Sequence, residues 1–244
     1  MSETSATQGK KAVILSGGLG TRLKPFTDAI PKPLLPVGEK AVLEIQIERL
    51  ARAGFEEIYL ATNYKSSYIE RFFGDGSDYG VKLFVSKERQ ALGTAGPLSL
   101  LRAQLSDAPF LVMNGDILTL MDFAKMYDFA CDRGAAFTAG VKKIVTPFAF
   151  GDIKFDGDRI TSVLEKPDIV SYALAGIYVL SPAALSYIPD NTYFGIDDLL
   201  HAMLRQGDPV LKYEIEEYWL DIGRVGDFEK AQKDYLEAEE HDHE

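Results

Sequence analysis

The stretch "KKAVILSGGLGTRLKPFTDAIPKPL", residues 10–34, decides the fold, because a short apolar run passes directly into a loop rich in glycine, proline and positive charge. The apolar run, residues 10–15, is typical of a strand. The loop, residues 16–34, contains three glycines, three prolines, one arginine and two lysines. In an open α/β sheet, ligands bind beyond the carboxyl ends of the strands, and the loop after the first strand is the usual place. We therefore expect this loop to hold a ligand.

The rest of the chain repeats this alternation of apolar runs and helical patterns. Further apolar runs follow at residues 56–63, 81–88 and 109–116, and residues 41–54 place apolar side chains on one helical face before Gly54 ends the helix. Strands that alternate with helices predict an α/β fold with a Rossmann-like, mixed but mainly parallel sheet flanked by helices. From residue 135 the strands are closely spaced, with a turn at "DGD", residues 156–158, which predicts a smaller, partly antiparallel lobe.

The absence of any repeat or linker-like stretch indicates a single domain over residues 9–240. Within it we expect a first part at about 9–134, a second part at 135–224 and a C-terminal helix at 225–240. The first eight residues are polar, and we expect residues 1–8 to be a disordered N-terminus. They also lack the apolar core of a signal peptide, and nowhere do eighteen apolar residues run together, so we expect a cytoplasmic protein.

The net charge of −11 argues against nucleic acids and anionic membranes as partners, because both require a basic surface. Residues 9–40 nevertheless carry six positive and two negative side chains, a local excess of +4. This region either binds a small polyanion or is an exposed basic patch without a ligand. The single cysteine excludes an intramolecular disulfide, and the three histidines show no metal-ligand spacing with it.

Glycine placement favours the polyanion. Gly17, Gly18 and Gly20 remove Cβ atoms where backbone N–H groups could approach phosphate oxygens. The loop fits neither the dinucleotide fingerprint nor the Walker A motif, since the glycines and the lysine those motifs require are missing. It does supply Arg22 for bidentate phosphate contact, and Lys32 stands between two prolines that restrict its backbone. The loop therefore predicts polyphosphate binding.

Two aspartates follow apolar strands at distant points of the chain. Asp116 comes directly after Asn114-Gly115, and Asp221 comes after Trp219-Leu220. Each could instead be a turn residue or a helix cap. If the two strands end at the same edge of the sheet, the pair offers the carboxylate oxygens with which Mg²⁺ binds alongside substrate phosphates.

With these residues in place, the loop resembles the signature of the sugar-1-phosphate nucleotidylyltransferases. Further motifs occur in that family's order, and the "LGTAGPLSLL" segment is similar to the mannose-1-phosphate guanylyltransferase branch. These are the segments at residues 92–101, 114–116 ("NGD"), 165–167 ("EKP"), 175–182 ("AGIYVLSP") and 219–231 ("WLDIGRVGDFEKA"). The resemblance runs from Lys11 to about Ala231. Relatives often carry a left-handed β-helix, and we expect none in a chain of this length.

The resemblance implies that a nucleoside triphosphate and a sugar 1-phosphate react with Mg²⁺ to give an NDP-sugar and pyrophosphate. It assigns the catalytic charges to Arg22 and Lys32, the metal to Asp116 and Asp221, and makes the partly antiparallel lobe the sugar-binding part. Nucleotide-binding residues are then Leu15, Gly17, Gly18, Gly20, Thr21, Glu88, Gly93 and Thr94. Sugar-phosphate-binding residues are Gly115, Gly151, Glu165, Lys166 and Gly176. Without the motif, Glu165 and Lys166 would equally be a solvated charge pair.

The base and the sugar are less well determined by sequence. A carboxylate at Glu88 could accept hydrogen bonds from two N–H groups of guanine, or it could pair with Lys87 or Arg89 in a solvated loop. We favour GTP with a mannose- or heptose-like sugar, and keep uridylyl, thymidylyl or cytidylyl transfer as alternatives. Many relatives have Asn where this chain has Leu174, so the sugar stays open. A catalytically silent nucleotide-sugar sensor, a molybdopterin nucleotidyltransferase and a homodimer also remain open.

Overall fold

The computed structural model describes residues 9–18, 20–63 and 65–242. The predicted disorder of residues 1–8 lies outside these residues. The helices are α1 (Phe26–Ala29), α2 (Val42–Arg52), α3 (Ser66–Phe73), α4 (Phe123–Asp132), α5 (Ile196–Gln206) and α6 (Val225–Asp242). The strands are β1 (Lys10–Leu15), β2 (Pro36–Val37), β3 (Lys40–Ala41), β4 (Phe55–Thr62), β5 (Lys82–Lys87), β6 (Phe110–Asn114), β7 (Ile117–Thr119), β8 (Phe137–Pro147), β9 (Asp152–Asp156), β10 (Arg159–Leu164), β11 (Asp168–Leu180), β12 (Val210–Glu214) and β13 (Trp219–Asp221).

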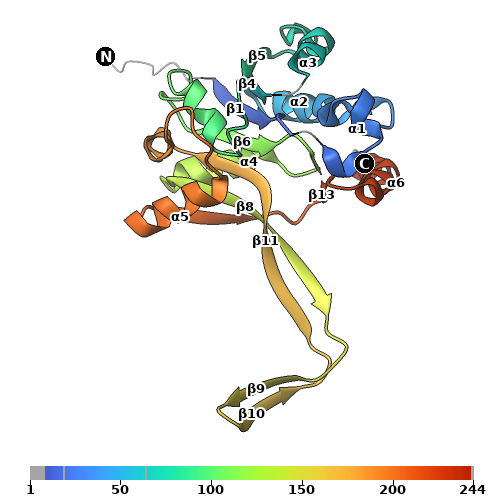
Figure 1. Cartoon of the computed structure of the whole chain (residues 1–244), viewed down its shortest axis with the longest axis vertical. Coiled ribbons are helices and arrows are strands. Elements are labelled where there is room, and N and C mark those ends of the chain that lie inside the picture. The colour runs from blue at the N-terminus through green and yellow to red at the C-terminus, as the bar shows by residue number, and fades with distance from the viewer. Residues whose placement is uncertain (1–8, 19, 64, 243–244) are drawn as a thin grey trace.

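A seven-stranded sheet organises the fold, in the order β12-β8-β11-β6-β1-β4-β5 (Figure 1). Strand β1 pairs in parallel with β4 and β6, and β4 pairs in parallel with β5. Strand β11 is antiparallel to both β6 and β8. The predicted fold class, a mixed and mainly parallel sheet flanked by helices, is confirmed.

Both faces of the sheet are covered, which explains why β1 is apolar at consecutive positions. Ala12 and Ile14 face a buried cluster that includes residues of α2, α3 and α4. Val13 faces the opposite cluster, built with α5 and the 3₁₀ segments at Gly96–Leu101 and Pro182–Tyr187. All three side chains are fully buried. The central strands are thus held in place by the hydrophobic effect on both sides.

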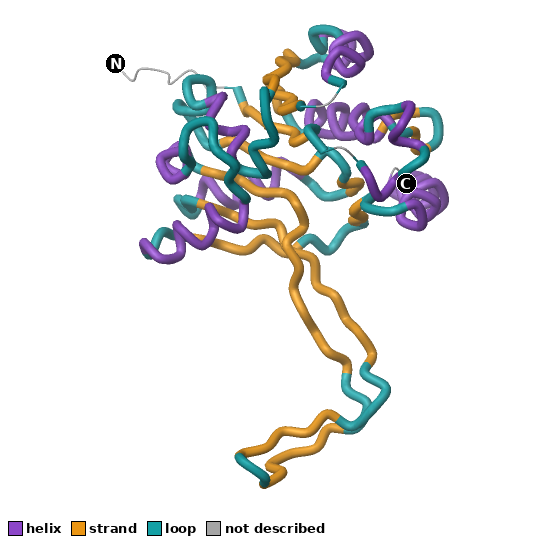
Figure 2. The backbone as a smooth tube through the Cα atoms, viewed as in Figure 1, coloured by secondary structure: helices purple, strands orange, loops and turns teal. Residues whose placement is uncertain are grey.

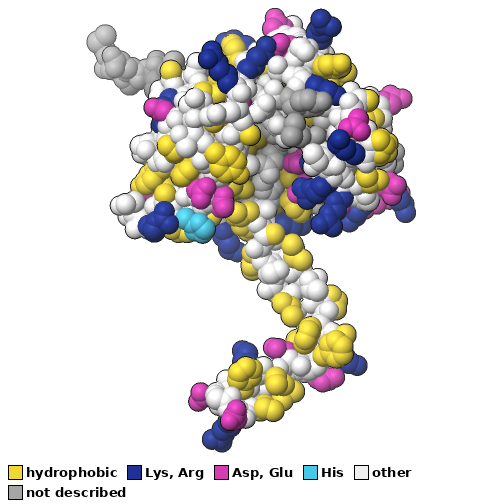
Figure 3. All heavy atoms as spheres, in the orientation of Figure 1, with side chains coloured by type: hydrophobic (Ala, Val, Ile, Leu, Met, Phe, Trp, Pro, Cys, Tyr) yellow, Lys and Arg dark blue, Asp and Glu magenta, His cyan; other side chains and the backbone are white. Residues whose placement is uncertain are grey.

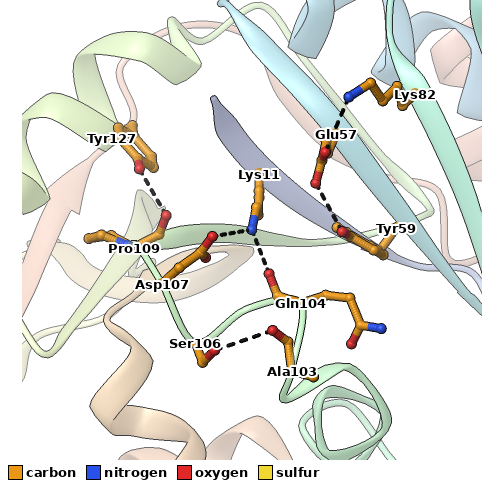
Figure 4. Close-up of polar contacts among 10 residues, drawn as sticks. All are labelled: Lys11, Glu57, Tyr59, Lys82, Ala103, Gln104, Ser106, Asp107, Pro109 and Tyr127. Carbon is orange, nitrogen blue, oxygen red and sulfur yellow. Dashed lines mark hydrogen bonds and ion pairs between the residues drawn. The ribbon is translucent and has the colours of Figure 1, made fainter. Parts of the chain in front are cut away.

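The amino ends and the carboxyl ends of the parallel strands have different surroundings. At the amino ends of the strands, polar pairs tie the chain together (Figure 4). Lys11 Nζ donates to Asp107 Oδ2 at 2.6 Å and to the Gln104 carbonyl at 2.7 Å, and Tyr59 donates to Glu57 at 3.0 Å. At the other edge the loops after β1, β4, β5 and β6 come together, because these four strands run parallel. That edge is open to a ligand.

The distal parts of β8 and β11, together with β9 and β10, leave the sheet as a long two-stranded projection, seen in Figure 2. We call residues 142–174 the arm, its end formed by β9 and β10 the arm tip, and the remainder the body. The pairing of β8 with β11 continues without a break from Leu174↔Val141 to Asp168↔Pro147. The smaller antiparallel part predicted from the closely spaced strands therefore takes an extended form in this chain.

None of the helices in the described ranges combines the length and the apolar character needed to cross a membrane.

Candidate active site

A cavity of about 230 Å³ lies at the carboxyl end of β1, under the glycine loop. Its polar lining includes Arg22, Lys32 and Asp116. Lys32 Nζ forms an ion pair with Asp116 Oδ2, and only 11% of the lysine side chain is exposed. A largely buried ammonium group beside phosphate-accessible backbone is the arrangement that neutralises a polyphosphate.

The chain reaches this geometry through local turn chemistry. Gly20 adopts the left-handed conformation, with φ of +62°, and a Cβ there would lie 2.7 Å from Thr27 Cγ2. Thr27 Oγ1 donates to the Gly20 carbonyl at 2.8 Å, which folds the loop back on itself. Lys32 then begins the short 3₁₀ segment Lys32–Leu34, preceded by Pro31 with φ of −54°. Thr21 follows Gly20 at the start of another 3₁₀ segment, Thr21–Leu23, and also lines the cavity.

The two predicted metal-binding aspartates come from adjacent strand ends. Strand β13 pairs antiparallel with β7 so that Asp221 faces Ile117, and the Ile222 N–H donates to the Asp116 carbonyl at 2.9 Å. Removal of the Asp221 carboxylate from water raises its pKa, and the negative charge of Asp116 adds to this effect. The positive charges of Lys32 and Arg22 act in the opposite direction. A carboxylate whose ionisation is opposed by a neighbouring negative charge favours a bound cation.

The donor set fits Mg²⁺ that is shared with a substrate. The described residues contain no group of three or more His, Cys, Asp or Glu side chains able to hold a metal alone. Ser16 adds a hydroxyl that is 3% exposed, lines the cavity and has no hydrogen-bond partner in the part of the chain that the structure describes. Two carboxylates with open positions are what Mg²⁺ uses when phosphates and water supply its other ligands.

A second cavity, of about 370 Å³, adjoins the first and shares Leu15, Gly18 and Asp116 with it. Glu88 lies on its wall, at the end of β5, and its Oε2 accepts a hydrogen bond from the Leu92 N–H at 3.0 Å. A Cβ at Gly17 would lie 3.0 Å from Glu88 Oε1, so glycine leaves the carboxylate its room. Lys87 pairs with Glu70 at 2.8 Å, away from Glu88.

Burial raises the pKa of Glu88, and the hydrogen bond from Leu92 partly offsets this. A half-buried carboxylate in a cavity retains acceptor capacity for a ligand. Gly93 and Thr94 line the same cavity but also have structural tasks. A Cβ at Gly93 would lie 2.7 Å from the Phe194 carbonyl oxygen, and Thr94 Oγ1 accepts from the Ile196 N–H at 2.8 Å at the start of α5.

The five predicted sugar-phosphate residues fall into two groups. Gly115 lines the first cavity, and Gly176 packs on Asn114, where a Cβ would lie 2.6 Å from the amide nitrogen. Gly151, Glu165 and Lys166 are together on the arm, between its ribbon and its tip. A Cβ at Gly151 would lie 3.3 Å from Glu165 Oε2. The structure thus brings the second group together on the arm, and Figure 1 shows that the part of the chain with β9 and β10 extends away from the body.

Some cavity residues escaped the sequence reasoning. Ser16, Asn63 and Asn114 each follow or end a parallel strand, so the rule that ligands bind at carboxyl ends could have found them. Tyr193 comes from a later loop that no local pattern marked, whereas Gly223 lies in the motif at residues 219–231 without having been predicted as a site residue.

The basic character of residues 9–40 does not form one patch. Lys10 pairs with Asp128 at 3.0 Å, Lys11 with Asp107, Lys24 with Asp28 at 2.9 Å, and Lys40 with Glu48 at 2.6 Å. Arg22 and Lys32 alone of the six line the cavity among the described residues. The local excess of charge is therefore concentrated in two side chains rather than spread as a surface patch.

Known proteins are similar to this chain over most of its length. The nucleotidyl transferase family model matches residues 11–238. The mannose-1-phosphate guanylyltransferase catalytic subunit beta of Danio rerio is 37% identical over 235 residues, which are 93% of this chain and 65% of the relative. This chain thus spans less than two thirds of that relative's length.

Solved structures resemble this chain over nearly their full length. A Bacillus anthracis protein assigned as a glucose-1-phosphate thymidylyltransferase, solved in complex with sucrose, superimposes with a TM-score of 0.76 at 25% identity. The match covers 91% of this chain and 94% of that one. HddC of Yersinia pseudotuberculosis, solved in complex with GMP-PN, gives a TM-score of 0.72 at 26% identity and covers 93% and 99% of the two chains.

Proposed function

Since the chain belongs to the nucleotidyl transferase family, we propose that it forms an NDP-sugar and pyrophosphate from a nucleoside triphosphate and a sugar 1-phosphate. The observation that carries the proposal is the pair of adjoining cavities. One contains Arg22, Lys32 and Asp116 under a glycine loop, and the other contains Glu88. A polyphosphate and a base joined by a ribose require two such neighbouring spaces.

The reaction needs alignment and charge neutralisation rather than a protein nucleophile. An oxygen of the sugar phosphate attacks the α-phosphorus, a new P–O bond forms, and the bond to the bridging oxygen of the β-phosphate breaks to release pyrophosphate. The attacking oxygen is already anionic at neutral pH, so no general base is required. This agrees with cavities lined by cations, backbone and carboxylates.

Each side chain has a separate task in this scheme. Backbone N–H groups of Gly17, Gly18 and Gly20 and the guanidinium of Arg22 bind the β- and γ-phosphates. Lys32 neutralises charge that develops at the α-phosphate. Asp116 and Asp221 would hold Mg²⁺, which when bound neutralises phosphate charge and orients the triphosphate.

We propose GTP as the favoured nucleotide. Glu88 offers a carboxylate that can accept from the two N–H groups on one edge of guanine, whereas uracil and thymine present one N–H between two carbonyl groups. The Danio rerio relative is named a guanylyltransferase, and HddC was solved with GMP-PN. A mannose-like sugar 1-phosphate is the corresponding acceptor, with Glu165 and Lys166 as its ligands. A cytoplasmic location and a homodimer stay predictions of the same kind.

The test is pyrophosphate release from GTP, UTP, dTTP, CTP and ATP, each paired with a panel of sugar 1-phosphates. We expect activity that needs Mg²⁺ or Mn²⁺ and is fastest with GTP. Asp116→Asn and Asp221→Asn should each raise the metal concentration needed for half-maximal rate at least tenfold, because each removes one charged ligand. Full activity in excess EDTA would refute the metal assignment.

A folded protein that binds GDP-sugar but releases no pyrophosphate with any pair would instead be a sensor subunit. Transfer to a pterin rather than to any sugar phosphate would indicate the molybdopterin branch.

A further inference from the structure

The arm exposes apolar side chains along its whole length, as Figure 3 shows for one side. In the ribbon, Val145 faces Val170 on one side of the pair, and these side chains are 50% and 48% exposed. Ile144 and Ile169, on the other side, are 41% and 49% exposed. A two-stranded ribbon with apolar groups on both faces is marginally stable alone in water.

The arm tip has the alternation of a strand pair with one covered face. Phe155 pairs with Ile160 and Ile153 with Val163, which places these four side chains on one face. The other residues of β9, which are Asp152, Lys154 and Asp156, face the other way. The four apolar side chains are 47–68% exposed. The arm tip therefore has an apolar face that the described residues of its own chain do not bury.

The arm also extends away from the two cavities in the body of its own chain. Strands β8 and β11 pair both in the arm and in the main sheet, with a register shift between Leu174 and Tyr178 where the two parts meet. The Lys212 ammonium lies 4.6 Å from the ring centroid of Tyr172 at the base of the arm. Glu165 and Lys166 are part of the arm, because they lie between β10 and β11. The body thus contains a phosphate site without its proposed sugar ligands, and the arm contains those ligands without a site.

We infer that two copies of this chain exchange arms, so that Glu165 and Lys166 of one copy complete the sugar-phosphate site of the other. The exchange is reciprocal, so it closes as a twofold dimer. The partner of each arm is a second copy of this chain, because each copy carries both the phosphate cavity on its body and Glu165 and Lys166 on its arm. The identity of the ligand rests on the proposed function, whereas the exchange itself does not.

The body offers a matching acceptor for the tip. An apolar cavity of about 320 Å³ lies beside the phosphate loop, lined by residues that include Pro25, Phe26, Ile30 and Phe228. Phe26 and Ile30 are 44% and 41% exposed. This cavity is formed largely by the same loop that carries Lys32, so a tip seated in it brings the arm to the phosphate cavity. The exchange covers both apolar surfaces at once.

Sedimentation gives the first test. The wild type should be a dimer at micromolar concentration, and Phe155→Asp combined with Val163→Asp should be a folded monomer. Lys154→Asp, on the polar face of the tip, is the matched control and should remain a dimer. A wild type that is monomeric at all concentrations, or a double variant that still dimerises, would overturn the exchange.

Cross-linking identifies which chain the arm contacts. In a Cys131→Ser background, a chain with Val163→Cys and a differently sized chain with Ile30→Cys are mixed and oxidised. We expect a covalent heterodimer, and none when Leu204→Cys on α5 replaces Ile30→Cys. No heterodimer from the mixture, or an intramolecular link in a chain carrying both Val163→Cys and Ile30→Cys, would overturn the proposal. This readout is independent of activity.

Complementation tests the shared site. Lys32→Ala and Lys166→Ala chains should each be inactive alone, and equal amounts exchanged together should recover about a quarter of the wild-type rate, because about half the dimers are mixed and each has one intact site. No recovery, with an active wild type, would overturn completion in trans. If the wild type itself makes no NDP-sugar, the proposed function fails while the cross-linking result still decides the exchange.

Discussion

The body and the arm both contain strands with large apolar side chains but differ in what covers those side chains. In the body, Phe110 on β6 is fully buried between helices and sheet, whereas Phe155 on β9 is 68% exposed. The apolar side chains of the body are buried within one chain, whereas the arm carries an exposed apolar surface that a second chain could bury. The core strands of the body are apolar at consecutive positions and the arm tip alternates apolar with polar residues, and the exposure of the apolar side chains tells the two regions apart.

The two regions also divide the proposed chemistry. The cations and carboxylates that would handle phosphates come from loops fixed by the buried parallel strands. Glu165 and Lys166, the proposed sugar ligands, lie on the arm, outside the rigid body. If this division is correct, changes in the body should abolish the reaction or the fold, and changes in the arm should affect acceptor use and assembly.

The largest effect is expected at Lys32. Lys32→Ala should lower kcat about a thousandfold, because a positioned charge that stabilises a transferring phosphoryl group is worth ~10³-fold or more. The free energy of unfolding should fall by only about 1 kcal/mol, since the lysine pairs with a partly exposed carboxylate.

Pyrophosphate release and urea unfolding measure the two effects. Lys24→Ala is the matched control, because Lys24 belongs to the same loop and pairs with Asp28 on its exposed side. It should change kcat by less than threefold. Near-normal turnover of folded Lys32→Ala would remove this loop from the reaction.

The same substitution in both regions tests the stability contrast directly. Phe110→Ala should cost about 3–5 kcal/mol in the free energy of unfolding, because it opens a cavity in a closed core. Phe155→Ala should change it by about 0.5 kcal/mol or less, measured at concentrations where dimers have dissociated. Urea unfolding followed by the fluorescence of Trp219 reports on the body in both variants. Equal losses would show that the arm folds as part of the core.

The fold of the body was predictable from the sequence because its signals are local. The apolar runs at residues 10–15 and 109–116 and the glycine stop at Gly54 correspond to β1, β6 and the end of α2. The turn at residues 156–158 likewise separates β9 from β10. Each depends on periodicity or turn chemistry within a few residues.

The arrangement of the site was only partly predictable. Parallel strands bring their loops to one edge, so Lys32, Asp116 and Glu88 could be expected near one another. The extended arm could not be foreseen, because alternation predicts a covered face without saying which chain covers it. Nor could the pairing of Lys10 and Lys11 with distant acids, since ion pairs across the fold leave no mark in the local sequence.

A smaller effect is expected for base selection in the body. Glu88→Gln should reduce the ratio of kcat/KM for GTP over UTP about 10- to 100-fold, corresponding to about 1–3 kcal/mol for a bidentate base contact. Since burial raises the pKa of Glu88, the wild-type preference should also weaken as the pH falls from 7 toward 5.

Initial rates with both nucleotides and one accepted sugar phosphate measure the ratio. Glu70→Gln is the control, because Glu70 pairs with Lys87 outside the cavity, and it should leave the ratio unchanged. A GTP preference that survives Glu88→Gln would show that another part of the second cavity reads the base.

The smallest effect is expected in the thermal stability of Asp221→Asn, and it tests whether Asp221 serves the site or the stability of the body. The pKa of Asp221 is raised, so the folded protein holds a proton that the unfolded chain has lost, and stability falls as the pH rises from the ordinary value of 3.8 through the raised pKa. Without metal, Asp221→Asn should therefore have a slightly higher Tm than the wild type at pH 7, and the gap should close toward pH 4. Asp75 is the control of opposite sign, because hydrogen bonds from Ser77 lower the pKa of its carboxyl, so Asp75→Asn should lower Tm at pH 7. Thermal unfolding in EDTA at both pH values measures the difference. A lower Tm for Asp221→Asn at pH 7 would show that Asp221 is a stabilising cap rather than a charge that awaits a cation.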